Sequence, residues 1–155
     1  MKGNETLLQT LNYMLADELA AINQYMVHAE MYESWGYEKL NKATEKRAID
    51  EMHHAEKLIS RILFLEGRPI VSELHPIHIG DSVEKSLNND CLAEQGAIKM
   101  YNDGIRQALD VGDNGSRELL EEILGDEEKH IDWIEAQLDQ IKQLGLQTYL
   151  TEQID

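Results

Sequence analysis

The sequence predicts an all-α protein folded as a four-helix bundle, with a long crossover between helices two and three and a short C-terminal fifth helix. Two observations support this. Apolar residues recur with helical periodicity in four long runs. The only prolines, Pro69 and Pro76, both fall between the second and third runs. Because 155 residues suit one core, we expect a single domain over residues 1–155.

The first two helices are expected at about residues 5–34 and 37–65, separated by a turn at Gly36. Each carries a stripe of leucine and isoleucine at helical spacing. The connection that follows, residues 66–80, is too long for a simple turn between antiparallel helices. We therefore expect it to cross the length of the bundle.

The third helix is expected to begin at Asp81, the first residue of a capping box, and to be ended by Gly112 and Gly115. The fourth is expected to begin near Ser116, a favourable N-cap, and to end at Gly145. A short fifth helix is expected over residues 146–153. All four long helices would span a tall bundle.

The chain is strongly acidic, with 30 acidic and 14 basic residues and a net charge of −16. This balance disfavours nucleic acid and anionic membranes as partners and favours attraction of cations. The single cysteine, Cys91, excludes an intrachain disulfide and a Cys-x-x-Cys metal site. Without an apolar leader or a membrane-length apolar stretch, the protein is expected in the cytoplasm.

One pattern occurs twice in the chain: a glutamate followed 33 positions later by Glu-x-x-His. The second copy follows the first by 76 positions at every member, which indicates two helical hairpins related by a pseudo-twofold axis. The i, i+3 spacing places the glutamate and the histidine of each pair on one helical face. The six residues are Glu18, Glu51 and His54 in the first copy, and Glu94, Glu127 and His130 in the second.

Four carboxylates and two imidazoles suit two Fe²⁺ or Mn²⁺ ions. The same arrangement, one glutamate from each of two helices and Glu-x-x-His from the other two, is known from di-metal carboxylate proteins. A single Glu-x-x-His is more often part of a solvated helix face. Here every candidate shares its stripe with leucine or isoleucine, and buried carboxylates without a metal would be costly. The sequence therefore predicts a di-metal centre.

The second helix has another apolar stripe, formed by Ile49, Met52, Ile59 and Leu63. A helix with two apolar faces in a small bundle usually packs on its own core and on another subunit. We therefore expect a homo-oligomer in which Met52 meets its symmetry mate. A methionine in such a stripe is ordinarily a packing residue.

The chain resembles bacterioferritin over essentially its full length. The resemblance rests on these stretches: Met1-Lys2-Gly3, Asn23-Gln24-Tyr25, Asp50-Glu51-Met52, Arg61-Ile62-Leu63-Phe64-Leu65-Glu66-Gly67, Asp126-Glu127 and His130-Ile131-Asp132-Trp133. It implies a ferritin-like fold and a hollow twenty-four-subunit shell that stores ferric mineral. It also implies a ferroxidase di-iron centre in each subunit and haem b at the twofold interfaces.

The resemblance implies roles for individual residues. The six residues of the doubled pattern match the di-iron ligands, with Glu51 and Glu127 as the bridging carboxylates. Met52 matches the axial haem ligand, and Tyr25 matches a tyrosine near the centre that can donate an electron. A small ferredoxin would supply electrons through the haem for iron release. Lys46 stands where some members have a histidine, which puts an accessory inner-surface iron site in doubt.

Other residues near the pattern are less constrained. Asp50, Asp90 and Asp126 precede ligand candidates by one or four positions and are candidates to hold imidazole N–H groups. Trp133 is equally consistent with a core position and with a role beside the centre. The remaining histidines are expected at surface, interface or loop positions, namely His28, His53, His75 and His78.

The predicted function is iron storage and detoxification by a ferroxidase, an enzyme that oxidises Fe²⁺ to Fe³⁺ with O₂ or H₂O₂. The alternative is a rubrerythrin-like di-metal oxidoreductase without mineral storage, since the same ligand set recurs in such enzymes. Its accompanying Cys-x-x-Cys pair is absent. A cage subunit contributing only haem or structure would predict a damaged ligand set, which is not seen. The sequence is compatible with a homopolymer or a mixed shell, and with iron as resident cofactor or transit substrate.

Overall fold

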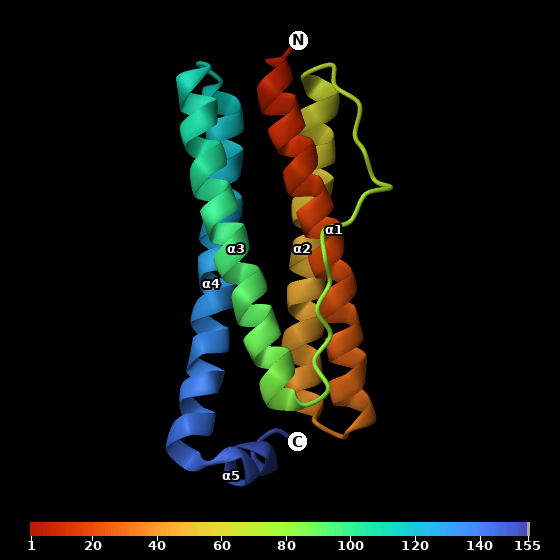
Figure 1. The fold of residues 1–155 in the computed structure, drawn as a ribbon, viewed down its shortest axis with the longest axis vertical. Coiled ribbons are helices and arrows are strands. Elements are labelled where there is room, and N and C mark those ends of the chain that lie inside the picture. Colours follow the sequence, from red (N-terminus) through yellow and green to blue (C-terminus); the bar gives the residue numbers. More distant parts are fainter. Residues whose placement is uncertain (155) are drawn as a thin grey trace.

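The computed structural model describes residues 1–154 and contains, over that range, five α-helices and no strand. The helices are α1 (Glu5–Ser34), α2 (Glu38–Phe64), α3 (Val83–Asp110), α4 (Asn114–Leu144) and α5 (Leu146–Thr151). The predicted all-α architecture is confirmed (Figure 1). Asp155, which the single-domain prediction includes, lies outside the described residues.

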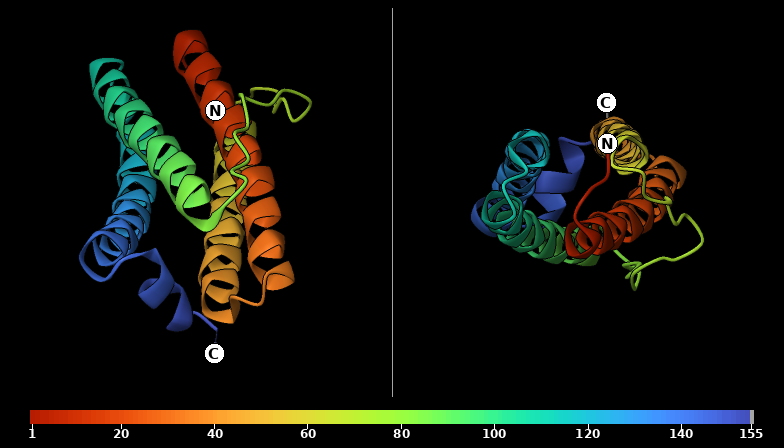
Figure 2. Two further views of the ribbon diagram at one scale, coloured as in Figure 1. Left: turned by 60° about the horizontal axis from the view of Figure 1, so that its bottom comes forward. Right: turned by 90° about the horizontal axis from the view of Figure 1, so that it is seen from above.

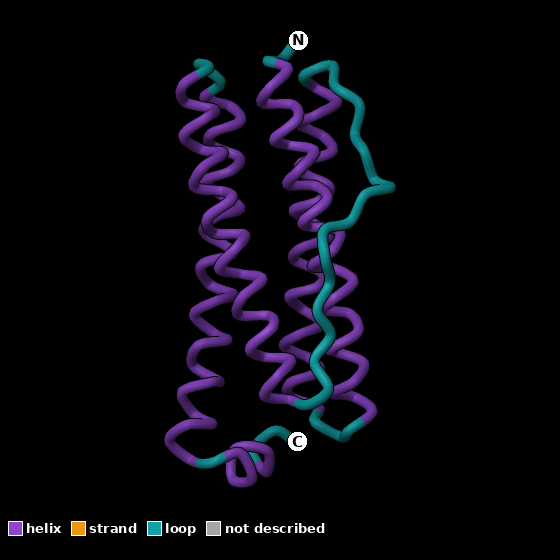
Figure 3. Tube along the Cα trace, viewed as in Figure 1, coloured by secondary structure: helices purple, strands orange, loops and turns teal. Residues whose placement is uncertain are grey.

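The four long helices form two antiparallel hairpins, α1 with α2 and α3 with α4 (Figure 1). The segment between Phe64 and Val83 runs the length of the bundle beside α1, as expected (Figure 3). It is attached to α1 by side chains: Asn12 Oδ1 accepts from the Ile70 N–H at 2.9 Å. Because this crossover returns the chain to the opposite end, α2 and α3 point in the same direction.

Two helix caps differ from those expected. The cap of α3 is Ser82 and not Asp81, because Ser82 has the extended backbone that lets its hydroxyl accept from an N–H of the first turn. The cap of α4 is Asp113, whose carboxylate accepts from the Ser116 N–H at 3.0 Å. A carboxylate is the stronger acceptor, and Arg61 also fixes it at 2.7 Å.

Apolar side chains fill the two ends of the bundle. One cluster includes Leu11, Leu58 and Ile123, all fully buried, and the other includes Tyr32 and Leu87. Each fully buried leucine contributes about 1.5–3 kcal/mol relative to an exposed one. The short α5 lies across the end that holds the second cluster (Figure 2). Along every long helix the doubled pattern lies between these two clusters, so packing on both sides fixes the helix spacing there.

The second apolar stripe of α2 remains on the surface of the chain. Ile49 and Met52 are each 44% exposed and Leu63 is 58% exposed, while Ile59 is half-buried. The predicted contact of this stripe with another subunit stays a prediction. Within residues 1–154, none of the helices combines the length and apolar character that a membrane crossing requires.

Candidate metal centre

The six residues of the doubled pattern come together in the middle of the bundle. Glu51 and Glu127 belong to two groups of donor atoms, one completed by Glu18 and His54 and the other by Glu94 and His130. Within each group the donor atoms all lie within 4.8 Å of one another. All six side chains are buried, the most exposed being His130 at 6%.

Each of these side chains keeps one buried polar atom that has no hydrogen-bond partner outside the six. The atoms are Glu18 Oε2, Glu51 Oε1, His54 Nδ1, Glu94 Oε2, Glu127 Oε1 and His130 Nδ1. Buried polar atoms are almost always hydrogen-bonded, and an unpaired one costs about 1–3 kcal/mol. Gathering six of them in one place is unfavourable unless cations take them up. Four carboxylate oxygens and two imidazole nitrogens suit two hard divalent cations, each bound by one imidazole.

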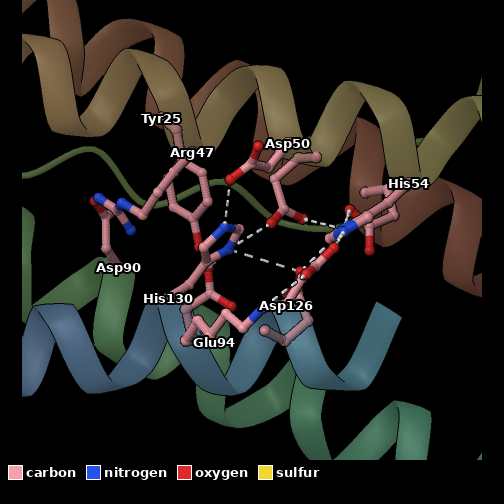
Figure 4. Close-up of polar contacts among 12 residues, drawn as sticks. Tyr25, Arg47, Asp50, His54, Asp90, Glu94, Asp126 and His130 are labelled. Carbon is pink, nitrogen blue, oxygen red and sulfur yellow. Dashed lines mark hydrogen bonds and ion pairs between the residues drawn. The ribbon is translucent and has the colours of Figure 1, made fainter. Parts of the chain in front are cut away.

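The two imidazoles are oriented by aspartates from the opposite hairpin. His54 Nε2 lies 2.9 Å from Asp126 Oδ2, and His130 Nε2 lies 3.0 Å from Asp50 Oδ2 (Figure 4). Because a carboxylate can only accept, each Nε2 carries the hydrogen. Each Nδ1 then faces the centre, 3.0 Å from a glutamate oxygen of the facing helix. Such partners fix the tautomer and raise the basicity of a ligating imidazole.

The two Asp–His contacts are related by the internal repeat, since Asp126 follows Asp50 by 76 positions. Each aspartate stands directly before the glutamate of its own helix and holds the histidine of the other. Two of the three aspartates expected to hold imidazole N–H groups of the centre therefore do so. The third, Asp90, binds a different imidazole, that of His28.

Without a cation, the centre favours bound protons. Burial raises the pKa of Glu51 well above its usual value, and the negative charge of Glu18 adds to this. Burial likewise raises the pKa of Glu127, with the charge of Glu51 next in size. Burial disfavours protonation of His54, but the neighbouring carboxylates of Glu127 and Glu18 outweigh this effect, so the pKa of His54 is raised. Cations entering the centre must displace these protons.

Two buried tyrosines donate to the glutamates of α1 and α3. Tyr25 O–H donates to Glu94 Oε1 at 2.6 Å, and Tyr101 O–H donates to Glu18 Oε1. Burial raises the pKa of both phenols well above 10, and the charges of Glu94 and Glu18 respectively add to this, so both remain donors. Sequence reasoning singled out Tyr25 and missed Tyr101. The signal was available, because Tyr101 follows Tyr25 by the same 76 positions.

Beyond the tyrosines the pseudo-twofold is broken. On the Tyr25 side, fully buried Asp90 accepts from Arg47 Nη2 at 2.9 Å and from Gln24 Nε2 at 2.9 Å, and contacts His28 Nδ1 at 2.8 Å. The Arg47 guanidinium lies 4.4 Å from the Tyr25 ring centroid, to one side of His130 (Figure 4). Sequence reasoning missed Arg47 and gave Asp90 a different imidazole.

The positions related by 76 residues are apolar or small on the Tyr101 side. Met14 corresponds to Asp90, Gly104 to His28 and Ile123 to Arg47. Met14 and Ile123 are fully buried. A Cβ added to Gly104 would lie 2.2 Å from Met14 Cε, so Met14 fills the space that a side chain at this position would need. One half of the centre therefore adjoins a buried cation and the other half adjoins hydrocarbon.

Several other residues can now be placed. Trp133 is half-buried, with its ring centroid 5.5 Å from the Arg47 guanidinium. Lys46 Nζ lies 3.4 Å from Asp50 Oδ2, so a cation already stands where the accessory iron site would need a ligand. The expectation of a surface, interface or loop position is wrong for His28, which is fully buried, because Asp90 and the Gly80 N–H satisfy its two ring nitrogens.

Comparison with known proteins agrees with this geometry. Residues 8–144 match the family model described as a ferritin-like domain. The chain is 40% identical to bacterioferritin of Rhodobacter capsulatus over 149 residues, covering 96% of this chain and 92% of that protein. It is 41% identical to a bacterial ferritin of Synechocystis over 155 residues, covering 99% of each. It is also 38% identical to bacterioferritin of Mycobacterium leprae, covering 96% and 94%. The chain belongs to the bacterioferritin family of ferritin-like proteins.

Proposed function

We propose that this protein is an iron-storage ferroxidase that binds two Fe²⁺ ions and oxidises them to Fe³⁺. The observation that carries the proposal is the buried, unpaired donor atom on each of six converging side chains. A site for two metal ions uses all six donors, whereas without metal the imidazole Nδ1 atoms can pair only with the glutamates of the centre and Glu18 Oε2 and Glu94 Oε2 remain unsatisfied. Membership in the bacterioferritin family supports iron as the metal. The ligands are Glu18, Glu51, His54, Glu94, Glu127 and His130.

Iron is the substrate of this reaction. Two Fe²⁺ ions supply two electrons together, so O₂ takes up two electrons and two protons and leaves as H₂O₂. With H₂O₂ as the oxidant, two electrons and two protons give two water molecules. Pairing the ions avoids a one-electron product of oxygen. We assign the bridging role to Glu51 and Glu127 because they belong to both groups of donor atoms.

The remaining residues hold and move protons around the centre. Asp50 and Asp126 keep the imidazole Nδ1 atoms directed at the iron. Tyr25 is the electron donor that we assign beside the centre. When a single Fe²⁺ is oxidised, Tyr25 supplies the second electron that O₂ needs to become H₂O₂, and its hydrogen bond to Glu94 at 2.6 Å gives the phenolic proton an acceptor.

We further propose that the subunits form a hollow shell of twenty-four copies that stores the ferric product. Haem b fits the exposed stripe of α2. Only residues on the axis of an isologous twofold contact meet their own copies, so with Met52 on that axis the two Met52 side chains would hold one haem between subunits. When bound, the haem supplies one-electron transfer, which a small ferredoxin can use to reduce and release stored iron.

The decisive experiment is an anaerobic titration of metal-free protein with Fe²⁺, followed by air, with ferric absorbance recorded against iron added. A fast phase that saturates at about two irons per chain supports the paired centre. Glu18→Ala and His130→Ala should abolish it, whereas Asp103→Asn, which alters an exposed ion pair with Lys99, should not. A titration without this break, or one indifferent to the ligand substitutions, would refute the ferroxidase assignment.

Two further measurements separate the storage role from the alternative. Light scattering should find a particle as large as a shell. The amount of iron that this particle accumulates should far exceed the capacity of its centres. A small particle that turns over peroxide without accumulating iron would instead favour a rubrerythrin-like oxidoreductase. Met52→Leu should remove haem absorbance from the purified protein while leaving the fast oxidation phase intact.

A further inference from the structure

A pocket of about 550 Å³ opens between α1, α3 and the crossover segment and reaches the centre. Its inner lining includes Glu51 and Glu127, the two glutamates shared by both groups of donor atoms. Ala93 and Gly96 of α3 also line it, and their small side chains leave the passage open. The two shared carboxylates therefore lie at the inner end of a pocket that opens to solvent.

An acidic residue and a histidine stand together in this pocket, outside the centre. Asp17 Oδ1 lies 2.9 Å from His75 Nδ1, and the two side chains are 31% and 22% exposed. Both residues line the pocket. They are therefore half-buried, in contact with solvent on one side and with the passage on the other. Neither belongs to the doubled pattern, and His75 comes from the crossover rather than from a helix of the bundle.

The crossover is held firmly where it supplies His75. The Tyr13 ring centroid lies 4.3 Å from the His75 ring centroid. Three residues further on, the His78 N–H donates to Gln24 Oε1 at 3.0 Å, which ties the segment to α1 again. Contacts on both sides thus fix the imidazole against Asp17, so this pair of donors is already positioned before any ligand arrives.

We propose that Asp17 and His75 form a docking site for a divalent cation, where Fe²⁺ pauses on its way to the centre. This inference rests on the proposed ferroxidase function. One carboxylate oxygen and one imidazole nitrogen are suitable donors for Fe²⁺, and water completes its coordination. A site with only two protein ligands releases its ion readily, whereas each inner group offers four donor residues. The cation takes the place of the hydrogen now shared by the pair.

Charge favours this direction of travel. The net charge of −16 attracts cations to the molecule as a whole, and a cleft lined by carboxylates concentrates them further. Along the passage the number of carboxylates increases, from Asp17 near solvent to Glu51 and Glu127 at the inner end. A simple structural ion pair between Asp17 and His75 would contribute to folding only, so the test must count bound metal.

The probe is Co²⁺, titrated anaerobically into metal-free assembled protein and followed by its visible absorbance. Wild type should bind about three ions per chain, two tightly and one weakly. Asp17→Asn and His75→Phe should each lose only the weak ion. Both replacements preserve shape, since asparagine matches the aspartate and phenylalanine keeps a ring against Tyr13. Glu127→Ala should lose tight binding and keep the weak ion, and anomalous scattering should place that ion between Asp17 and His75.

The kinetic counterpart uses Fe²⁺ and air. At limiting Fe²⁺ the initial oxidation rate of Asp17→Asn should fall by about tenfold, while the amplitude at saturation stays unchanged. If wild type and both pocket variants bind the same number of Co²⁺ ions and oxidise limiting Fe²⁺ at the same rate, the docking site is refuted. That result would leave the break at two irons per chain intact. Absence of that break in wild type would instead refute the proposed function, independently of the weak ion.

Discussion

Asp126→Asn should weaken metal binding by about tenfold without removing a ligand. Asp126 makes one hydrogen bond to the centre, 2.9 Å from His54 Nε2, and its side chain is 38% exposed. Carboxylates that hold a ligating imidazole change metal affinity by about 10–100-fold. Because solvent reaches Asp126 and an asparagine oxygen can still accept, we expect the lower end, about 1.4 kcal/mol.

Asp50→Asn should have a similar effect through His130, which it holds at 3.0 Å. The two aspartates act on different imidazoles, so the double variant should lose about a hundredfold in affinity if the effects are independent. Asp103→Asn is the matched control, because Asp103 pairs with Lys99 on the exposed face of α3.

The assay is an anaerobic competition between metal-free protein and a chromophoric chelator for Co²⁺, with helix content checked by circular dichroism. Unchanged affinity in both single variants would refute the argument that these aspartates orient the imidazoles. Complete loss of one bound ion would refute it differently, because it would make the aspartate itself a ligand.

Asp90→Asn should destabilise the metal-free protein by about 3–5 kcal/mol in urea denaturation, because it leaves the buried Arg47 guanidinium without its counter-charge. Burial acts to raise the pKa of Asp90, but His28 and Arg47 lower it overall. The contribution of Asp90 to the free energy of unfolding is therefore complete above pH 3.8 and is lost as pH falls through its lower pKa in the folded state. Asp90→Asn should lack this pH-dependent contribution. Loading with Co²⁺ should release protons, measured with an indicator in weak buffer, because the pKa values of Glu51 and Glu127 are raised. For the same reason, Co²⁺ affinity should fall as pH is lowered. Leu58→Ala should cost about 2–5 kcal/mol and leave Co²⁺ stoichiometry unchanged.

Each of these has a contrary outcome. Equal acid sensitivity of wild type and Asp90→Asn would place the acid-labile groups elsewhere. Metal loading without proton release would mean that the carboxylates are already ionised in the metal-free centre. A loss of bound Co²⁺ in Leu58→Ala would show that the centre depends on the packing of that end of the bundle.

The helices and the convergence of six polar residues were predictable from the sequence because both depend on regular spacing along helices. The 3.6-residue periodicity gave the helices, and the 76-residue offset paired the two halves. The same offset would also have predicted Tyr101 and the reciprocal aspartates. Helix caps were less predictable, since Asp81 and Ser82 are both good candidates and only the backbone conformation decides between them.

The Arg47, Asp90 and His28 contacts could not be predicted in this way. These contacts join α2, α3 and α1 at positions that have no polar counterpart 76 residues away, so the internal repeat does not predict them. The Asp17–His75 pair was equally hidden. It depends on where an irregular segment crosses α1, and no periodicity constrains such a segment.

The broken pseudo-twofold makes the two halves of the centre electrostatically different. Arg47 lies on the Glu94 side. Burial acts to raise the pKa of Glu94, but His130 and, to a smaller extent, the positive charge of Arg47 lower it overall. On the Glu18 side, Ile123 occupies the corresponding position. The Arg47 charge is balanced by Asp90 at 2.9 Å, so the Glu94 side adjoins a buried ion pair where the Glu18 side adjoins Ile123. With iron bound as proposed, the two ions would lie in unequal surroundings, and Mössbauer spectra of the ferrous protein should resolve two unequal quadrupole doublets.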